Sequence, residues 1–238
     1  MLRNKVAHLA QDVHFGSCWI DFCFFIAASW QGYQVNPTLF LLNLWDGCEQ
    51  YYAIREHRVM PAYIAMLRGI NVSGHKLIKM EALRASFGAL RFSNVKTYIQ
   101  SGNVVFGAED RSVAAVSKKI ERRILRDFGF SVAVFLRTAK ELEETIKRNP
   151  FLTDTAIDLS KLHVTFLSDA ASAPAVEVLQ TLVMKPEQIR VIGRQIYLYC
   201  PNGYGQTKLS NTAIEKKLSV GATTRNWKTV NTLLAMTQ

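Results

Sequence analysis

The order of apolar segments after Met60 constrains the fold more than any other feature of this sequence. A strand-like run, Ala62–Leu67, precedes a segment with apolar residues at spacings of three and four, which is typical of a helix with one buried face. Two strand-like runs, a second helical segment and a strand-like run ending near Arg137 follow. This β-α-β-β-α-β order predicts a split βαβ unit, the ferredoxin-like α/β plait.

The pattern nearly repeats in the second half of the chain. A linking helix over residues 139–148 is ended by Asn149-Pro150 and leads to a new strand-like run, Leu162–Leu167. Further strand and helix patterns follow, and a last helix is expected to begin near Arg225 with Thr224 as its N-cap.

The fold class predicted from these patterns is α+β, with two tandem ferredoxin-like plaits and a C-terminal helix. We place the first plait at residues 60–137, a linking helix and loop at residues 138–160, and the second plait at residues 161–238. In each plait, the first two strands are expected to run parallel through a right-handed crossover, so their carboxyl ends lie at one sheet edge.

The first 59 residues differ in composition from the rest. They hold three of the four Cys and three of the four Trp. Their four basic and five acidic residues give them a net charge of −1, so the remainder carries +11 and the whole chain +10. This shift predicts that residues 1–59 are a non-native or poorly ordered N-terminal extension. A secretory signal and a small added helical subdomain are the alternatives.

The apolar run Phe22–Trp30 is too short to span a bilayer, and the cysteine pattern does not require an oxidising compartment. We therefore expect a cytoplasmic protein that does not cross a membrane. Its cysteine and histidine spacings predict no metal site and no cofactor. The loop "NGYGQTK" lacks the spacing of a Walker phosphate loop, and no catalytic constellation is recognisable, so whether the protein is an enzyme stays open.

The tight turn in "YIQSGNVVF" raises a question of function. Gly102 and Asn103 tolerate the positive φ that a short hairpin needs, so turn chemistry alone explains them. The tip also faces the loop "RGINVSGHK" across the predicted sheet edge, where a ligand could bind. If it does, Asn103→Ala should weaken ligand binding at little cost in folding stability, whereas Gly102→Val should damage folding.

Two loop clusters contain the candidate ligand-binding residues. Both combine backbone-permissive residues with cationic or amide side chains, the groups that hold phosphates and carboxylates. The first cluster, at the edge of the first plait, comprises Arg68, Asn71, Ser101 and Asn103. The second, at the edge of the second plait, comprises Lys208, Arg225 and Asn226. Plain turn and capping roles remain the alternative for each residue.

Several motifs occur in one order from Met60 onward: "LRGINVSGHKLIKM", "TYIQSGNVVF", "NPF", "HVTFL", "YLYCPNGYGQTKLS" and "ATTRNW". On these motifs the chain resembles the domain of unknown function 1697 family, over about residues 60–238. The resemblance implies a bacterial cytosolic protein of two α/β plaits, with no assigned activity.

The charge of the chain favours an anionic partner. The formal net charge is +10, and the predicted helix over residues 112–128 carries Lys118, Lys119, Arg122, Arg123 and Arg126 on its outer side. For the helix taken alone, a solvated charged face is the simpler interpretation. For the whole chain we expect a protein that binds an anionic ligand, with nucleic acid slightly preferred. An enzyme acting on a phosphorylated small molecule at the Arg68/Asn71/Ser101/Asn103 edge, or an interaction module without a ligand, are the other hypotheses.

Overall fold

The computed structural model describes residues 60–110 and 112–238, which belong to one unit of the chain, Val59–Gln238. The predicted N-terminal extension lies outside the described residues. Among the residues described, no helix is long and apolar enough to cross a membrane.

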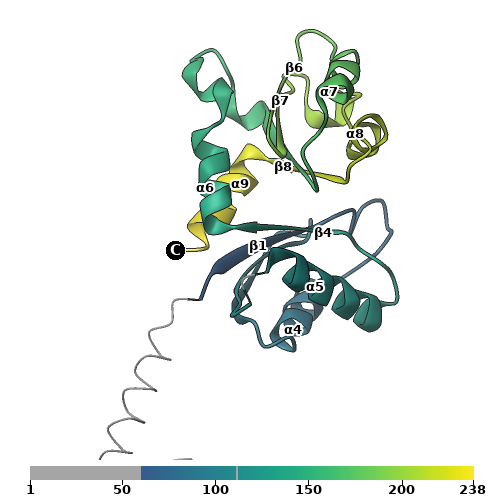
Figure 1. The fold of residues 1–238 in the computed structure, drawn as a ribbon, viewed down its shortest axis with the longest axis vertical. Helices are drawn as coiled ribbons and strands as arrows, with labels where there is room; N and C mark the ends of the chain where they lie inside the picture. Colours follow the sequence, from purple (N-terminus) through teal and green to yellow (C-terminus); the bar gives the residue numbers. More distant parts are fainter. Residues whose placement is uncertain (1–59, 111) are drawn as a thin grey trace, which may run out of the picture. The chain divides into compact units, whose positions relative to one another are not determined.

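The first half forms a four-stranded antiparallel sheet with the strand order β2-β3-β1-β4. Helices α4 and α5 lie on one face of this sheet (Figure 1). The elements are β1 (Ala62–Leu67), α4 (Met80–Gly88), β2 (Ser93–Tyr98), β3 (Asn103–Gly107), α5 (Val113–Phe128) and β4 (Val134–Thr138).

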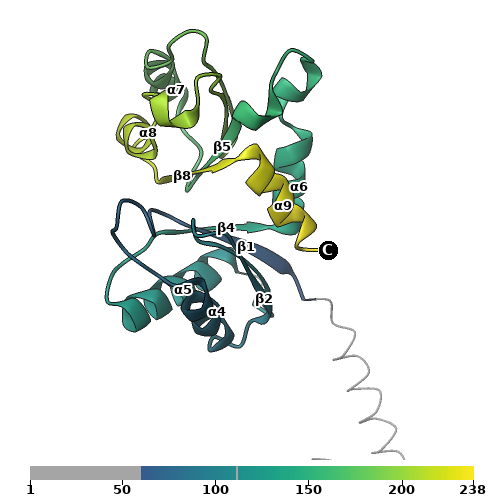
Figure 2. The same cartoon turned by 180° about the vertical axis from the view of Figure 1, so that it is seen from behind.

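The second half repeats this arrangement in the order β6-β7-β5-β8, again with antiparallel neighbours. Its elements are β5 (Leu162–Leu167), α7 (Ala173–Gln180), β6 (Gln188–Ile192), β7 (Gln195–Tyr199), α8 (Asn211–Leu218) and β8 (Ala222–Asn226). Two further helices, α6 (Ala139–Lys147) after the first sheet and α9 (Trp227–Ala235) after the second, lie side by side (Figure 2). The predicted α+β class is confirmed.

Three apolar cores hold the described residues together. One lies between the first sheet and helices α4 and α5, and another lies between the second sheet and helices α7 and α8. The third is shared: Ile64 and Phe135 of the first sheet belong to the same buried cluster as Val164 and Tyr197 of the second, together with Trp227 of α9. The inner faces of the two sheets therefore pack on a common core. Alternation along each strand sends successive side chains to the inner and outer cores.

Local sequence chemistry sets several element ends. The Ser112 side chain caps α5 by accepting a hydrogen bond from the Ala115 N–H, and Gly129 ends the same helix with a φ of 78°. Thr138 and Glu141 form a reciprocal capping box at the start of α6. Strand β4 therefore turns directly into α6, the linking helix predicted from the sequence.

One predicted boundary is wrong. The sequence indicated Thr224 as the N-cap of the last helix and Arg225 in its first turn, but β8 extends to Asn226, and Asn226 is the N-cap. Its side-chain oxygen accepts from the Thr229 N–H at 2.8 Å. The reason is strand pairing: Arg225 lies opposite Val164 of β5, so the ladder holds it in extended backbone. Its side chain consequently enters the protein interior instead of a helix N-terminus.

Candidate functional site

Arg225 is the centre of a buried polar cluster that joins the two halves. Its side chain is 8% exposed, and it donates from every nitrogen of the guanidinium group. An arginine has five N–H donors, and here each has a protein acceptor. The acceptors are the Asn103 Oδ1 at 2.5 Å, the Thr223 Oγ1 and Thr224 O at 2.9 Å, the Leu67 O at 2.9 Å and the Ser101 O at 3.1 Å.

Asn103 is the main partner of Arg225 in the first half. It is fully buried, and its Nδ2 donates to the Tyr98 O at 3.2 Å and to the Ser101 Oγ at 2.9 Å, while its Oδ1 accepts from Arg225. The hairpin tip therefore does more than turn the chain, because it also binds an arginine from 122 residues away. One residue of the second predicted loop cluster, Arg225, thus meets the first cluster here.

Asn71 closes the neighbouring loop onto the hairpin. Its Nδ2 donates to the Ile78 O at 3.0 Å and to the Gln100 O at 2.9 Å, and its Oδ1 accepts from the Ile78 N–H at 2.8 Å. Asn71 has a φ of 53°, a region that asparagine tolerates better than most residues. The amide thus holds an unusual backbone conformation in place.

Arg68 makes a second connection between the halves. Its Nε and Nη2 donate to the two carboxylate oxygens of Glu215 on α8, at 3.1 and 3.0 Å. The Nη2 also lies 3.4 Å from the Thr212 Oγ1. Such a bidentate pair is geometrically specific, although it is partly exposed and therefore contributes little free energy.

Lys208 and Asn226 do not join the Arg225 cluster. Lys208 is exposed, and within residues 60–110 and 112–238 no hydrogen bond or ion pair engages its ammonium group. Asn226 is exposed and caps α9. Four of the seven predicted ligand contacts lie at the junction between the halves and form hydrogen bonds across it: Arg68, Ser101, Asn103 and Arg225. A fifth, Asn71, binds the adjoining hairpin through the Gln100 O. Their role as ligand contacts stays a prediction.

Arg137 mirrors Arg225 and was missed by the sequence analysis. It is 2% exposed, and its Nη2 donates to the Leu167 O at 2.7 Å while its Nη1 donates to the Leu136 O at 2.9 Å. Its guanidinium lies 5.6 Å from the centre of the Phe166 ring, and its Nε is buried without a partner among the described residues. The sequence signal that could have identified it is an arginine directly after the apolar residues of a buried strand.

The two buried arginines have perturbed acidity. Burial lowers the pKa of Arg225 to about 10, and the positive charge of Arg68 acts in the same direction. Burial likewise lowers the pKa of Arg137 to about 10, with a further contribution from Arg194. Both guanidinium groups remain charged at neutral pH, so each must rely on carbonyl and amide oxygens to replace its hydration.

A second polar network lies within the second half, around Thr224, the residue before Arg225. The Thr224 hydroxyl bonds to the Thr165 Oγ1 at 2.7 Å, to the Tyr204 OH at 3.1 Å and to the Asn211 Oδ1 at 2.7 Å. The His163 ring stacks on Tyr204 with centroids 4.9 Å apart. Burial lowers the pKa of His163 and raises that of Tyr204. The network fixes the strand carrying Arg225.

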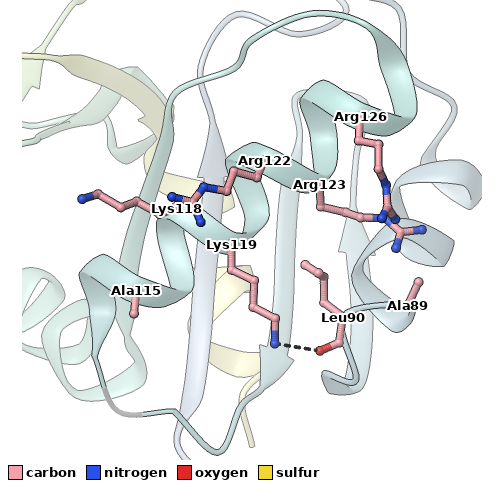
Figure 3. Close-up of a pocket in the computed structure, with 8 residues that line it drawn as sticks. All are labelled: Ala89, Leu90, Ala115, Lys118, Lys119, Arg122, Arg123 and Arg126. Atoms are coloured by element: carbon pink, nitrogen blue, oxygen red, sulfur yellow. Dashed lines mark hydrogen bonds between the residues drawn. The ribbon is translucent and has the colours of Figure 1, made fainter.

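A cationic groove lies on the helical face of the first half, between α5 and the turn after α4 (Figure 3). Its volume is about 580 Å³. It is lined by three apolar residues, Ala89, Leu90 and Ala115, and by five cations, Lys118, Lys119, Arg122, Arg123 and Arg126. We call these five side chains the α5 cationic face.

The members of the α5 cationic face differ in how far they are neutralised. Arg123 and Arg126 bond to Asp127 at 2.5 and 3.3 Å. Lys119 donates to the Leu90 O at 3.3 Å and lies 5.4 Å from the Phe92 ring centre. Lys118 and Arg122 are exposed and, within the part of the chain that the structure describes, have no bonded partner.

The family model described as "Protein of unknown function (DUF1697)" matches residues 60–197, more than half of the chain. The chain belongs to the DUF1697 family. The resemblance seen in the motifs is confirmed over that segment, whereas the motif "ATTRNW" with Arg225 lies beyond the match.

A solved structure shares the fold of this DUF1697 protein. It is the conserved bacterial protein SP0830 from Streptococcus pneumoniae, with 23% sequence identity and a TM-score of 0.61, and the alignment covers 76% of this chain and all of that one. No curated protein matches the chain.

The chemistry available to this DUF1697 protein differs between its two polar regions. At the junction, the guanidinium groups are engaged with protein oxygens, so the region is suited to holding the halves together. Among the described residues, no group of three or more His, Cys, Asp or Glu side chains is placed to hold a metal ion. The α5 cationic face offers exposed ammonium and guanidinium groups, which are suited to binding anions in solvent.

Proposed function

We propose that this DUF1697 protein binds nucleic acid through the α5 cationic face. The observation that carries the proposal is the density of one sign of charge: five of the nine residues from Lys118 to Arg126 are cations. At 3.6 residues per turn, they fall within a sector of about 140° of the helix. Glu121 and Asp127 lie outside that sector.

An ordinary solvated face accounts poorly for this arrangement. Solvated helix faces usually mix both signs, with opposite charges four residues apart. Here three pairs with that spacing carry like charges, Lys118–Arg122, Lys119–Arg123 and Arg122–Arg126, against one pair of opposite charges, Arg123–Asp127. Like-charge pairs destabilise an isolated helix by about 0.2–0.5 kcal/mol each. A bound polyanion would remove the repulsion, which gives the clustering a physical reason.

The second half provides an internal comparison. Helix α8 occupies the position in its half that α5 occupies in the first, between the third and fourth strands. It carries Lys216 and Lys217 beside Glu215, a net charge of +1 from two cations and one anion, whereas α5 has five cations and two anions, a net +3. High charge is thus a property of one helix and not of the repeated architecture.

The alternative is an enzyme acting on a phosphorylated small molecule at the Arg68/Asn71/Ser101/Asn103 edge. It is supported by the convergence of these residues. Against it, the side-chain amides of Asn71 and Asn103 already have protein partners, so a ligand would have to replace them. We place this proposal second.

We also propose that each half is a ferredoxin-like plait and that the protein is cytoplasmic. The first is supported by the β-α-β-β-α-β element order together with the antiparallel strand order 2-3-1-4 in both halves. The second rests on the sequence prediction alone.

The test compares two charge-matched double variants of the full chain. Lys118→Gln with Arg122→Gln removes two cations from the α5 cationic face, and Lys216→Gln with Lys217→Gln removes two from α8. Fluorescence anisotropy with a labelled oligonucleotide at 0.1 M salt should show the first variant about 60-fold weaker than wild type, from roughly eightfold per lost phosphate contact. The second should stay within about threefold. Equal losses, or none, would contradict the proposal.

A further inference from the structure

We infer, building on the proposed function, that the ligand is a nucleic-acid duplex held by its phosphate backbone without regard to base sequence. The α5 cationic face carries the cations that such binding needs, and no aromatic ring, amide or carboxylate is among the side chains that line its groove.

Stacking of unpaired bases requires exposed aromatic side chains. No Phe, Tyr or Trp is among the large apolar residues exposed on the described part of the chain. Phe92, which lies beneath the ammonium group of the groove residue Lys119, stacks on Phe106 with ring centroids 4.4 Å apart. Phe92 therefore offers no free face to a base.

Base-edge reading uses amide and carboxylate side chains as well as arginine, placed by a rigid network. The groove is lined by alanine, leucine, lysine and arginine alone. Lys118 and Arg122 are exposed and unpaired within the described residues, so neither is fixed in the fork geometry that selects guanine. Flexible cations of this kind contact phosphates, which carry no sequence information.

Charge density distinguishes a duplex from a single strand. From Lys118 to Arg126 the helix rises about 12 Å, at 1.5 Å per residue. A duplex presents about seven phosphates over that length, whereas one helical strand presents about three or four. The same helix face therefore meets about twice as many phosphates on a duplex as on one strand.

The test measures binding of the full chain to a DNA duplex, an RNA duplex and each of their separated strands, of one length and at one salt concentration. A second pair of duplexes has a scrambled sequence of the same composition. We expect at least one form of duplex to bind about tenfold more tightly than its own strands, with scrambled and original duplexes within about threefold. The DNA and RNA arms identify which helical form is preferred.

Two kinds of result separate this inference from the proposed function. Single strands that bind as tightly as both duplexes, or a scrambled duplex that binds tenfold more weakly, would overturn the inference while leaving nucleic-acid binding in place. Binding of all probes that is unchanged in Lys118→Gln with Arg122→Gln would overturn the proposed function itself. Thermal unfolding of this variant at the wild-type temperature, expected because both side chains are exposed, establishes that lost binding does not reflect lost folding.

Discussion

Arg137 and Arg225 reach across the molecule in opposite directions to equivalent acceptors. The Arg137 Nη2 donates to the carbonyl oxygen of Leu167, the last residue of β5, and the Arg225 Nη2 donates to that of Leu67, the last residue of β1. Each arginine comes from the fourth strand of its own half. Each half thus donates a hydrogen bond from one buried arginine to a backbone carbonyl of the other half, in addition to sharing an apolar core with it.

Arg225→Ala should destabilise the protein more than Arg137→Ala. Loss of Arg225 leaves the buried Asn103 Oδ1 and Leu67 O without a donor, at a cost of roughly 1–3 kcal/mol for each unsatisfied group. Arg137 makes fewer bonds and already has an unpaired Nε. Urea unfolding measures both, with the exposed Arg84→Ala as control. Arg225→Ala as stable as that control would contradict a role in joining the halves.

Asn103→Ala should lower the free energy of unfolding by about 2 kcal/mol or more. Asn103 is fully buried and makes three hydrogen bonds, one of them to a charged group. The sequence alone predicts little cost in folding stability for this change if the hairpin tip binds a ligand. In a double-mutant cycle, Asn103→Ala and Arg225→Ala should be strongly non-additive. Additive losses would show that the bond between them contributes little.

Gly102→Ala should cost more stability than Gly129→Ala, although both glycines have a positive φ, of 75° and 78°. A Cβ at Gly102 would lie 2.6 Å from the Ile70 Cδ1 and 2.9 Å from the Leu67 Cβ, whereas one at Gly129 would meet nothing within 4 Å. Gly129→Ala therefore measures backbone strain alone, about 1–2 kcal/mol, and Gly102→Ala adds overpacking of about 1–3 kcal/mol. Thermal unfolding compares them, and equal losses would contradict the close packing at the hairpin.

His163 should make folding stability sensitive to mild acid. Burial lowers its pKa in the folded protein below the ordinary value of 6.5, so the unfolded chain binds a proton first as the pH falls. The stability contributed by neutral His163 is therefore present above about pH 6.5 and is lost as the pH falls below that value. Comparing the free energy of unfolding at pH 7.5 and 5.5, His163→Gln should lose less than wild type. Equal losses would show that other groups set the dependence.

The local parts of the fold could be predicted from the sequence, because periodicity, capping residues and turn glycines act over a few positions. Strand β5 and the caps of α5 are of this kind. The site was predicted less completely. Asn103 was identified through turn chemistry, but its partner Arg225 lies 122 residues away and was assigned to a helix end. Pairing with β5 overrode that local interpretation, and no short-range pattern reports such pairing.

Arg137 shows the other limit of prediction from sequence. It ends the run "AVFL", whose alternation predicts inward and outward faces but not what covers the inward one. Its acceptor, the Leu167 O, belongs to the second sheet. The chemistry of the junction thus depends on how two separately predictable halves pack together.

The salt dependence of nucleic-acid binding tests the central claim most directly. For a DNA duplex, log K should fall linearly with log salt concentration, with a slope reduced in magnitude by about 0.9 for each phosphate contact removed. Lys118→Gln with Arg122→Gln should therefore make the slope less steep by about 1.8, while Lys216→Gln with Lys217→Gln leaves it unchanged. Identical slopes for wild type and the α5 variant would contradict the account, because the cations of α5 would then release no counterions from the nucleic acid.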